Sequence, residues 1–189
     1  MAQFTKQALA EALKNMMKTK SLDKITVKDL VESCNVNRQT FYYHFQDIYD
    51  LLGWIYRSEA LDSIQNSRSY GTWQQGLLTI FEYVEHNKEL CEGTYRSLGR
   101  EHMERFLNEV LNQLVGDVVD EIAAEQPISA DHRDFIVRFY SYAFAGILME
   151  WVGQGMKTPS AVLVSNMSLI MEGNLQLAVE RFKNEDFYE

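Results

Sequence analysis

The sequence has few residues that break helices and few that cross-link a chain. Of its 189 residues only two are proline, Pro127 and Pro159, and two are cysteine, Cys34 and Cys91. Two isolated cysteines without CxxC spacing provide no disulfide framework, which indicates a reducing compartment. No apolar run approaches the roughly 18 residues that span a bilayer, and the amphipathic start lacks the apolar core of a signal peptide. We therefore expect a cytoplasmic protein without a membrane segment.

Motifs of enzymes and metal sites are also missing. The sequence has no Gly-rich phosphate loop, no G-x-S-x-G elbow and no HExxH pair. His102 lies beside Glu101 and Glu104, and His86 follows Glu85. Neighbours one or two positions apart point to different faces of a helix, so these sets are poorly placed to share a metal. We expect no enzyme activity, no metal and no cofactor.

What the chain does have favours an all-α fold. Leu, Met, Ala, Glu and Lys are frequent, and apolar residues recur with a period near 3.6 over long stretches. A chain of this length buries about 70% of its unfolded surface, enough for one compact unit or two small ones. The predicted helices run from residue 5 to 18 or 20, from 47 to about 66, from 72 onward, and over 101 to 124, 131 to 154 and 159 to 183.

Residues 26 to 52 predict a short helix, a tight turn and an aromatic-rich second helix. Thr26 can cap the first helix, because a threonine oxygen accepts a hydrogen bond from a free amide near the helix start. The turn, Asn35-Val36-Asn37, contains asparagines that tolerate left-handed geometry and can cap the next helix. The residues predicted to face inward are Val27, Leu30, Val31, Cys34, Phe41 and Phe45. This arrangement is typical of a helix-turn-helix that contacts DNA.

The outer face of the second helix is unusual for a surface that only meets water. It carries Arg38, Gln39, Thr40, Tyr42, Tyr43 and His44. Arginine can bind the major-groove edge of guanine, glutamine can pair with adenine, and hydroxyl groups can bind phosphates. The alternative is a helical hairpin whose aromatic residues fill a core. Two adjacent tyrosines after Phe41 cannot all face inward on one helix, which argues against that alternative.

The charge is distributed unevenly along the chain. The formal net charge is -9, but residues 1 to 50 hold seven Lys and Arg against six Asp and Glu, a net of +1. The remaining residues hold eleven against twenty-one, a net of -10. A near-neutral first part and an acidic second part suit a protein that touches DNA only with its N-terminal face.

Four segments together resemble the helix-turn-helix signature of the TetR family of bacterial transcription regulators. They are Ile25 to Leu30, Val36-Asn37, Thr40 to Phe45 and Leu51-Leu52. The resemblance covers roughly residues 5 to 55. Similarity also extends to a subgroup of the family that includes the regulator of the dihydroxyacetone-kinase operon.

The resemblance implies a three-helix DNA-binding head, residues 1–47, and a helical bundle for dimerisation and regulation, residues 48–189. The family often has a lysine at the start of the fourth helix, where this chain has Ile48. One phosphate contact is therefore missing, which lowers the expected affinity without abolishing binding. The predicted DNA-contacting residues are Lys6, Thr26, Lys28, Asn37, Arg38, Gln39, Thr40, Tyr42, Tyr43 and His44. For Lys28, a solvated lysine is the alternative.

The last two predicted helices carry more apolar surface than one small bundle needs. The predicted dimer interface comprises Phe135, Phe139, Ala143, Gly146, Ile147, Trp151, Leu163, Met167, Ile170, Met171, Asn174 and Leu177. Pairing two copies in a four-helix arrangement would bury this excess. The alternative is that these residues only complete the core of the monomer. A homodimer would place two recognition helices about 34 to 36 Å apart, on adjacent major grooves of a palindromic operator.

The site that would bind an effector is harder to locate in the sequence. Residues that could line a ligand cavity are Trp54, Trp73, Phe81, Tyr95, His102, Met103, Phe106 and Tyr142, although such residues at helical spacing also form ordinary cores. The resemblance implies a homodimeric repressor of transcription whose binding to double-stranded DNA is controlled by a small-molecule or protein effector. The alternative is a transcriptional activator, or an adaptor, controlled by a protein partner.

Overall fold

The computed structural model describes residues 2–61, 69–124 and 127–186, and these residues form helices without any strand. The all-α prediction is confirmed. Three helices form the head: α1 (Ala2–Met17), α2 (Val27–Ser33) and α3 (Arg38–His44). The body comprises α6 (Trp73–His86), α7 (Lys88–Tyr95), α8 (Arg100–Ala123), α9 (Ala130–Gly153), α10 (Ser160–Met171) and α11 (Asn174–Asp186). A short 3-10 turn, η1 (Leu22–Lys24), precedes α2.

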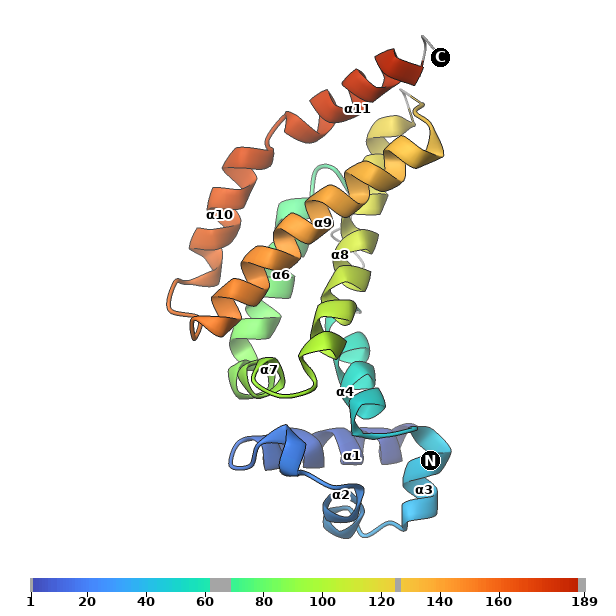
Figure 1. The fold of residues 1–189 in the computed structure, drawn as a ribbon, viewed down its shortest axis with the longest axis vertical. Helices are drawn as coiled ribbons and strands as arrows, with labels where there is room; N and C mark the ends of the chain where they lie inside the picture. Colours follow the sequence, from blue (N-terminus) through green and yellow to red (C-terminus); the bar gives the residue numbers. More distant parts are fainter. Residues whose placement is uncertain (1, 62–68, 125–126, 187–189) are drawn as a thin grey trace.

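Helix α4 (Ile48–Tyr56) leads from the head into the body (Figure 1). It continues into a π-helical turn, η2 (Arg57–Leu61). The connecting helix was predicted to reach residue 66, and residues 62–68 lie outside the described part of the chain. The buried residues of α4 are Leu51, Leu52, Gly53, Ile55 and Tyr56, whereas Ile48 and Trp54 are half-buried.

The head is a compact three-helix unit around α1. Leu9 and Leu13 of α1 are fully buried together with Leu30 of α2 and Phe41 of α3. Burial of these four side chains stabilises the head by roughly 1.5 to 3 kcal/mol each. These side chains form the part of the apolar core that lies beneath the helix-turn-helix, and this core continues into the body.

The longest helices, α8 and α9, pack against each other and form the centre of the body. Leu111 and Leu114 of α8 and Phe144 and Leu148 of α9 are all buried. Figure 1 shows α10 and α11 along one side of this pair, with the head at the opposite end of the molecule from α11.

Two breaks were not predicted. The apolar stripe that begins near residue 72 is divided at Asn87, where α6 ends and α7 begins. The helix predicted over 159 to 183 is divided at Gly173, whose φ of 74° lies in the left-handed region that favours glycine. The first break leaves the apolar residues on the buried side, and around the second break the apolar residues are divided between core and surface, so the pattern alone revealed neither.

Candidate nucleic-acid interface

Helix α2 begins with a complete capping box. The Thr26 hydroxyl accepts a hydrogen bond from the Asp29 amide at 3.2 Å, and the Asp29 carboxylate accepts one from the Thr26 amide at 2.8 Å. Lys20 forms an ion pair with the same carboxylate at 2.9 Å. Hydrogen bonds from Lys20 and Thr26 lower the pKa of Asp29 to about 2, so this residue is charged at neutral pH. The start of α2 is thus held by side chains on both sides of it.

The second helix, α3, is capped by the turn residue before it. The Asn37 side-chain oxygen accepts hydrogen bonds from the Thr40 amide at 2.7 Å and from the Thr40 hydroxyl at 3.0 Å. Asn35 has a φ of 52°, the left-handed geometry expected for the turn. Phe41 and Phe45 are buried. The predicted caps and turn are confirmed, and of the predicted inward-facing residues Leu30, Val31, Phe41 and Phe45 are buried, whereas Val27 and Cys34 are half-buried against the core.

The outer face of α3 is polar and aromatic. Arg38 and Gln39 are exposed, and the side chains of Tyr42 and Tyr43 are 58% and 82% exposed. His44 is half-buried, with its ring 4.9 Å from that of Tyr43. Helix α3 lies at the end of the molecule that is distant from α10 and α11 (Figure 1). Nothing in the described body covers this face.

Two predicted lysines have partners within the head. The Lys6 ammonium lies 5.6 Å from the ring centroid of Phe45 and 5.7 Å from that of Trp54, which are cation–π distances. Lys28 is exposed and lies 3.7 Å from Glu32, one turn later on α2. Thr26, Asn37 and Thr40 use their polar atoms in the helix caps. Among the predicted DNA-contacting residues, the exposed side chains that have no partner among the described residues in a helix cap or ion pair are therefore Arg38, Gln39, Tyr42 and Tyr43 of α3.

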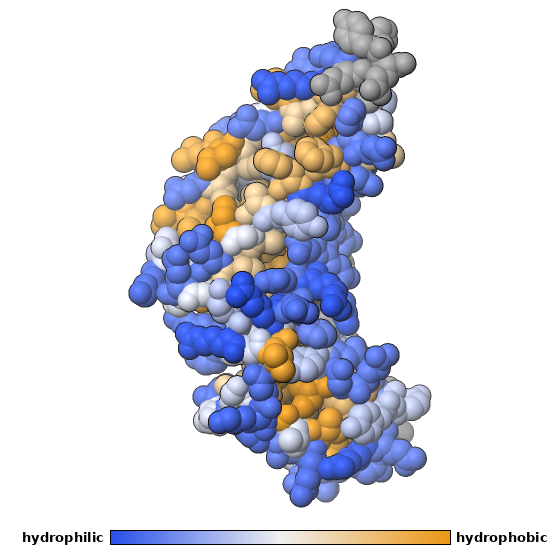
Figure 2. Space-filling view, viewed as in Figure 1, coloured by the Kyte–Doolittle hydropathy of each residue, from blue (hydrophilic) through white to orange (hydrophobic). Residues whose placement is uncertain are grey.

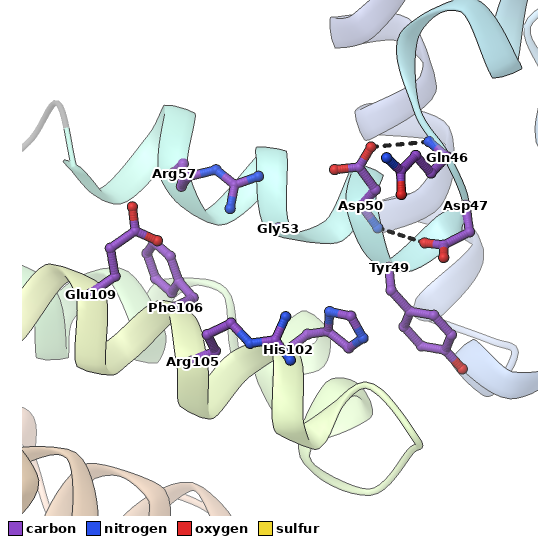
Figure 3. A pocket seen from close by; sticks show the side chains of 10 residues that line it. All are labelled: Gln46, Asp47, Tyr49, Asp50, Gly53, Arg57, His102, Arg105, Phe106 and Glu109. Atoms are coloured by element: carbon purple, nitrogen blue, oxygen red, sulfur yellow. Dashed lines mark hydrogen bonds between the residues drawn. The ribbon is translucent and has the colours of Figure 1, made fainter.

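A cleft of about 230 Å³ lies where the head meets the body, between α4 and α8 (Figure 3). It is lined by Gln46, Asp47, Tyr49, Asp50, Gly53 and Arg57 on one side and His102, Arg105, Phe106 and Glu109 on the other. Asp47 and Asp50 accept hydrogen bonds from backbone amides at the start of α4. The ring of Tyr49 stacks on that of His102, with centroids 4.9 Å apart. Each wall carries charges of both signs, so the cleft is polar.

The eight predicted ligand-contacting residues do not surround one cavity among the described residues. Trp73, Phe81, Met103 and Phe106 are buried, Trp54, Tyr95 and His102 are half-buried, and Tyr142 is exposed on α9. Only His102 and Phe106 of this set line the cleft between α4 and α8. Trp73 lines a gap of about 10 Å³, near the minimum for one water molecule, and a surface hollow of about 250 Å³ that no other residue of this set lines. Core packing accounts for the four buried side chains.

An apolar surface runs over α9, α10 and α11, where Figure 2 shows hydrophobic side chains gathered in the upper part of the molecule. Its exposed members are Phe135, Phe139, Tyr142, Ile147, Val162, Leu169, Ile170 and Leu177. Val162 and Leu169 were not in the predicted dimer interface, although their spacing from Ile170 on α10 places them nearby. Trp151, Met167 and Met171, which were predicted there, lie in the core of the single chain. The remaining predicted residues are exposed or half-buried.

By length and composition, two stretches of the described residues resemble membrane spans. They are Ala130–Gly153 and Ser160–Asn184, each with a mean hydropathy of 1.2. Half of the first and 28% of the second is buried within the molecule. The second is interrupted at Gly173, so it is two helices, α10 and α11. Their apolar residues are divided between the core and the exposed apolar surface.

Comparison with known proteins connects both parts of the chain to transcription. Residues 5–53 match the profile described as bacterial regulatory proteins of the tetR family, and residues 71–173 match a transcriptional regulator C-terminal region. The first match covers the helix-turn-helix and part of α4. The second covers α6 to α10.

Proteins similar to this chain are also transcription regulators. The chain is 26% identical, over 80% of its length and 81% of the relative, to the HTH-type dhaKLM operon transcriptional activator DhaS of Lactococcus lactis subsp. lactis. A solved dihydroxyacetone kinase operon activator DhaS is similar with a TM-score of 0.71, 23% identity and coverage of 92% and 97% of the two chains. The repressor AlkX from Dietzia sp. is similar with a TM-score of 0.59, 17% identity and the same coverage.

The fold, the helix-turn-helix and both profile matches agree on one assignment. The predicted resemblance to the subgroup that includes the dihydroxyacetone-kinase regulator is confirmed as well. The chain belongs to the TetR family of bacterial transcriptional regulators and carries the family's DNA-binding helix-turn-helix.

Proposed function

We propose that the protein binds a palindromic operator as a homodimer, with α3 of each copy in the major groove. The observation that carries this proposal is the outward face of α3. Arg38 and Gln39 stand at its first turn, where they can reach base edges, and Tyr42 and Tyr43 follow on the next turn. Their exposure in the free protein leaves these side chains available to DNA.

The ten predicted residues then divide into two roles. Arg38, Gln39, Tyr42, Tyr43 and His44 contact DNA directly. The helix-capping residues Thr26, Asn37 and Thr40 position α2 and α3 and so support DNA binding indirectly. Lys28 reaches the backbone after leaving Glu32, at little cost because an exposed pair at i and i+4 contributes roughly 0.3 to 0.5 kcal/mol. Lys6 acts through the packing of α1 on Phe45.

The homodimer is proposed to form through the exposed apolar surface of α9, α10 and α11. A surface with Phe139 60% exposed and Ile170 71% exposed is larger than single scattered apolar residues would make. Exposed Ala143 and Gly146 on α9 allow close approach of a second copy, and space for a Cβ is open at Gly146. Association about a two-fold axis would cover this surface on both copies.

The sign of regulation has two candidates. Activation is favoured by the relative in Lactococcus lactis, which is an operon activator and covers most of this chain. Repression relieved by an effector is the second candidate, and it is favoured by similarity in fold to the repressor AlkX. Transcription from a bound promoter, measured with and without the purified protein, distinguishes the two. We place either activity in the cytoplasm, together with the DNA.

The DNA-binding proposal is tested by replacing Arg38 or Tyr43 with alanine and measuring affinity for an operator duplex at two salt concentrations. Each change removes an exposed side chain, so folding stays intact. A base contact by Arg38 predicts a loss of about 1 to 3 kcal/mol and weaker sequence discrimination. Arg96→Ala, an exposed body residue paired with Glu92, is the matched control. Equal affinity of wild type and both α3 variants would contradict the proposal.

A further inference from the structure

Glu59 is the point at which the head, the connecting segment and the body meet. It lies in the π-helical turn η2 that follows α4. One carboxylate oxygen pairs with the Lys14 ammonium of α1 at 2.8 Å. The other accepts a hydrogen bond from the Tyr83 hydroxyl of α6 at 3.0 Å. A single carboxylate thus connects a head helix to a body helix.

The surroundings of Glu59 make this connection stronger than a solvated ion pair. The side chains of Lys14 and Glu59 are only 20% and 31% exposed. Charges that are partly removed from water attract more strongly than those at a fully exposed surface. Burial lowers the pKa of Lys14, but hydrogen bonds to Glu11 and Glu59 raise it overall, so the ammonium remains charged. Burial and the neighbouring Glu59 raise the pKa of Tyr83, so its hydroxyl remains a donor.

The backbone at this position is also unusual. Residues Arg57–Leu61 form a π-helical turn at the end of α4. Such turns are rare and locally wider than an α-helix, and they occur often where a side chain is needed in a particular place. Here the turn lies one residue beyond Tyr56, whose buried hydroxyl donates to Thr94 of α7 at 2.9 Å. Two successive polar contacts therefore fix the end of α4 against the body.

The head has a second set of contacts with the body, made by Asp23 in η1 and Tyr49 in α4. The Asp23 carboxylate accepts from the Leu98 amide at 3.1 Å, and Tyr49 stacks on His102 beside the open cleft between α4 and α8. Glu59 and Asp23 therefore both bond the head to the body, and the cleft between α4 and α8 leaves room for the head to tilt when the Glu59 bonds are lost. The angle of the head then depends on the bonds made by Glu59.

We propose that Glu59 is a positioning residue for operator specificity, because it sets the angle of the head and hence the separation of the two α3 helices in the dimer. This inference rests on the proposed dimeric DNA binding. The two helices must match adjacent major grooves about 34 to 36 Å apart. A small tilt of each head changes that separation. Loss of the Glu59 bonds should therefore weaken discrimination between half-site spacings rather than recognition of the half-site itself.

The test measures the affinity of wild type, Glu59→Gln and Glu59→Ala for three duplexes. One has the preferred half-site spacing, and the others have one base pair more or fewer. Glu59→Gln retains an acceptor for Tyr83 but loses the charge that holds Lys14, and it conserves the shape. We expect the preference for the best spacing to fall by about fivefold in Glu59→Ala, and by less in Glu59→Gln. Tyr83→Phe, which removes only the hydroxyl, should reduce the same preference.

Glu11→Ala is the matched control. Glu11 also pairs with Lys14, at 2.6 Å, but within α1, so its loss removes equal charge without touching the connection between head and body. It should keep the spacing preference of wild type. An unchanged preference in Glu59→Ala and Tyr83→Phe, or an equal loss of affinity at all three spacings, would overturn the inference. A wild type that prefers no palindrome at any spacing would instead contradict the proposed function.

Discussion

At the residue scale, two short polar side chains hold the helix-turn-helix, because Thr26 caps α2 and Asn37 caps α3. Thr26 and Asn37 were predicted from residue type and position alone, since a short polar oxygen before a helix has few other uses. The arrangement of Lys14, Glu59 and Tyr83 was missed. Tyr83 is 24 positions and Lys14 is 45 positions from Glu59 in the chain, and no local sequence pattern connects the three residues.

Replacing the cap of α3 should destabilise the head. Asn37→Ala removes the acceptor for the Thr40 amide and hydroxyl, and we expect the free energy of unfolding to fall by about 0.5 to 2 kcal/mol. Urea denaturation measures the change. The neighbouring exposed residue supplies a control, because Gln39→Ala should alter stability by less than about 0.5 kcal/mol. Equal effects of the two substitutions would argue against the cap.

Asp29 should make stability depend on acidity. Its pKa in the folded protein is lowered to about 2 from 3.8, so its contribution to stability is present above pH 3.8 and is lost as pH falls toward about 2. Asp29→Asn cannot titrate. The difference in urea midpoint between wild type and this variant should be largest near neutral pH and shrink below pH 3.8. A difference that is constant over this range would contradict the assignment.

At the element scale, helix type was predictable and helix ends were less so. The period of apolar residues identified every long helix of the body, because burial of one face requires that period. The divisions at Asn87 and Gly173 were not predicted, since the apolar residues continue with a helical period on both sides of each break. The predicted ligand set failed to form one cavity for a related reason. Aromatic residues at helical spacing fit a core equally well.

Gly173 provides a test at this scale. Its φ of 74° strains any side chain with a Cβ, so Gly173→Ala should lower the free energy of unfolding by about 1 to 2 kcal/mol. Asparagine tolerates left-handed geometry better, so Gly173→Asn should lose less. Thermal and urea denaturation of both variants supply the comparison. If alanine were tolerated as well as asparagine, the break between α10 and α11 would not depend on this conformation.

At the scale of the whole molecule, the distribution of charge and apolar surface assigns separate tasks to the two ends. The head has a net charge close to zero and carries the exposed face of α3, whereas the body is acidic and has an apolar surface on α9 to α11. Acidic side chains elsewhere on the body repel phosphate, which confines DNA to the head. The surface positions of the charges and of the apolar side chains depend on the assembled fold. The sequence could therefore predict only the net charge of each part and the helical period of the apolar residues.

The apolar surface leads to a prediction about assembly. Phe139→Glu together with Ile170→Glu should convert a dimer into a folded monomer, because both side chains are exposed in the single chain and charged groups would be buried in the dimer. Light scattering coupled to size exclusion gives the mass. Leu98→Glu, 78% exposed near the head, should leave the dimer intact. A double variant that keeps the mass of wild type would place the interface elsewhere.

The central claim, dimeric DNA recognition through α3, is tested most directly by selecting bound duplexes from a random DNA pool with the purified protein at two salt concentrations. Our account predicts enrichment of a palindrome with half-sites about one helical turn apart, and an affinity that falls steeply as salt rises. Arg38→Ala should enrich a less defined sequence. Failure to enrich any sequence at low salt, with the protein folded and dimeric, would contradict the account.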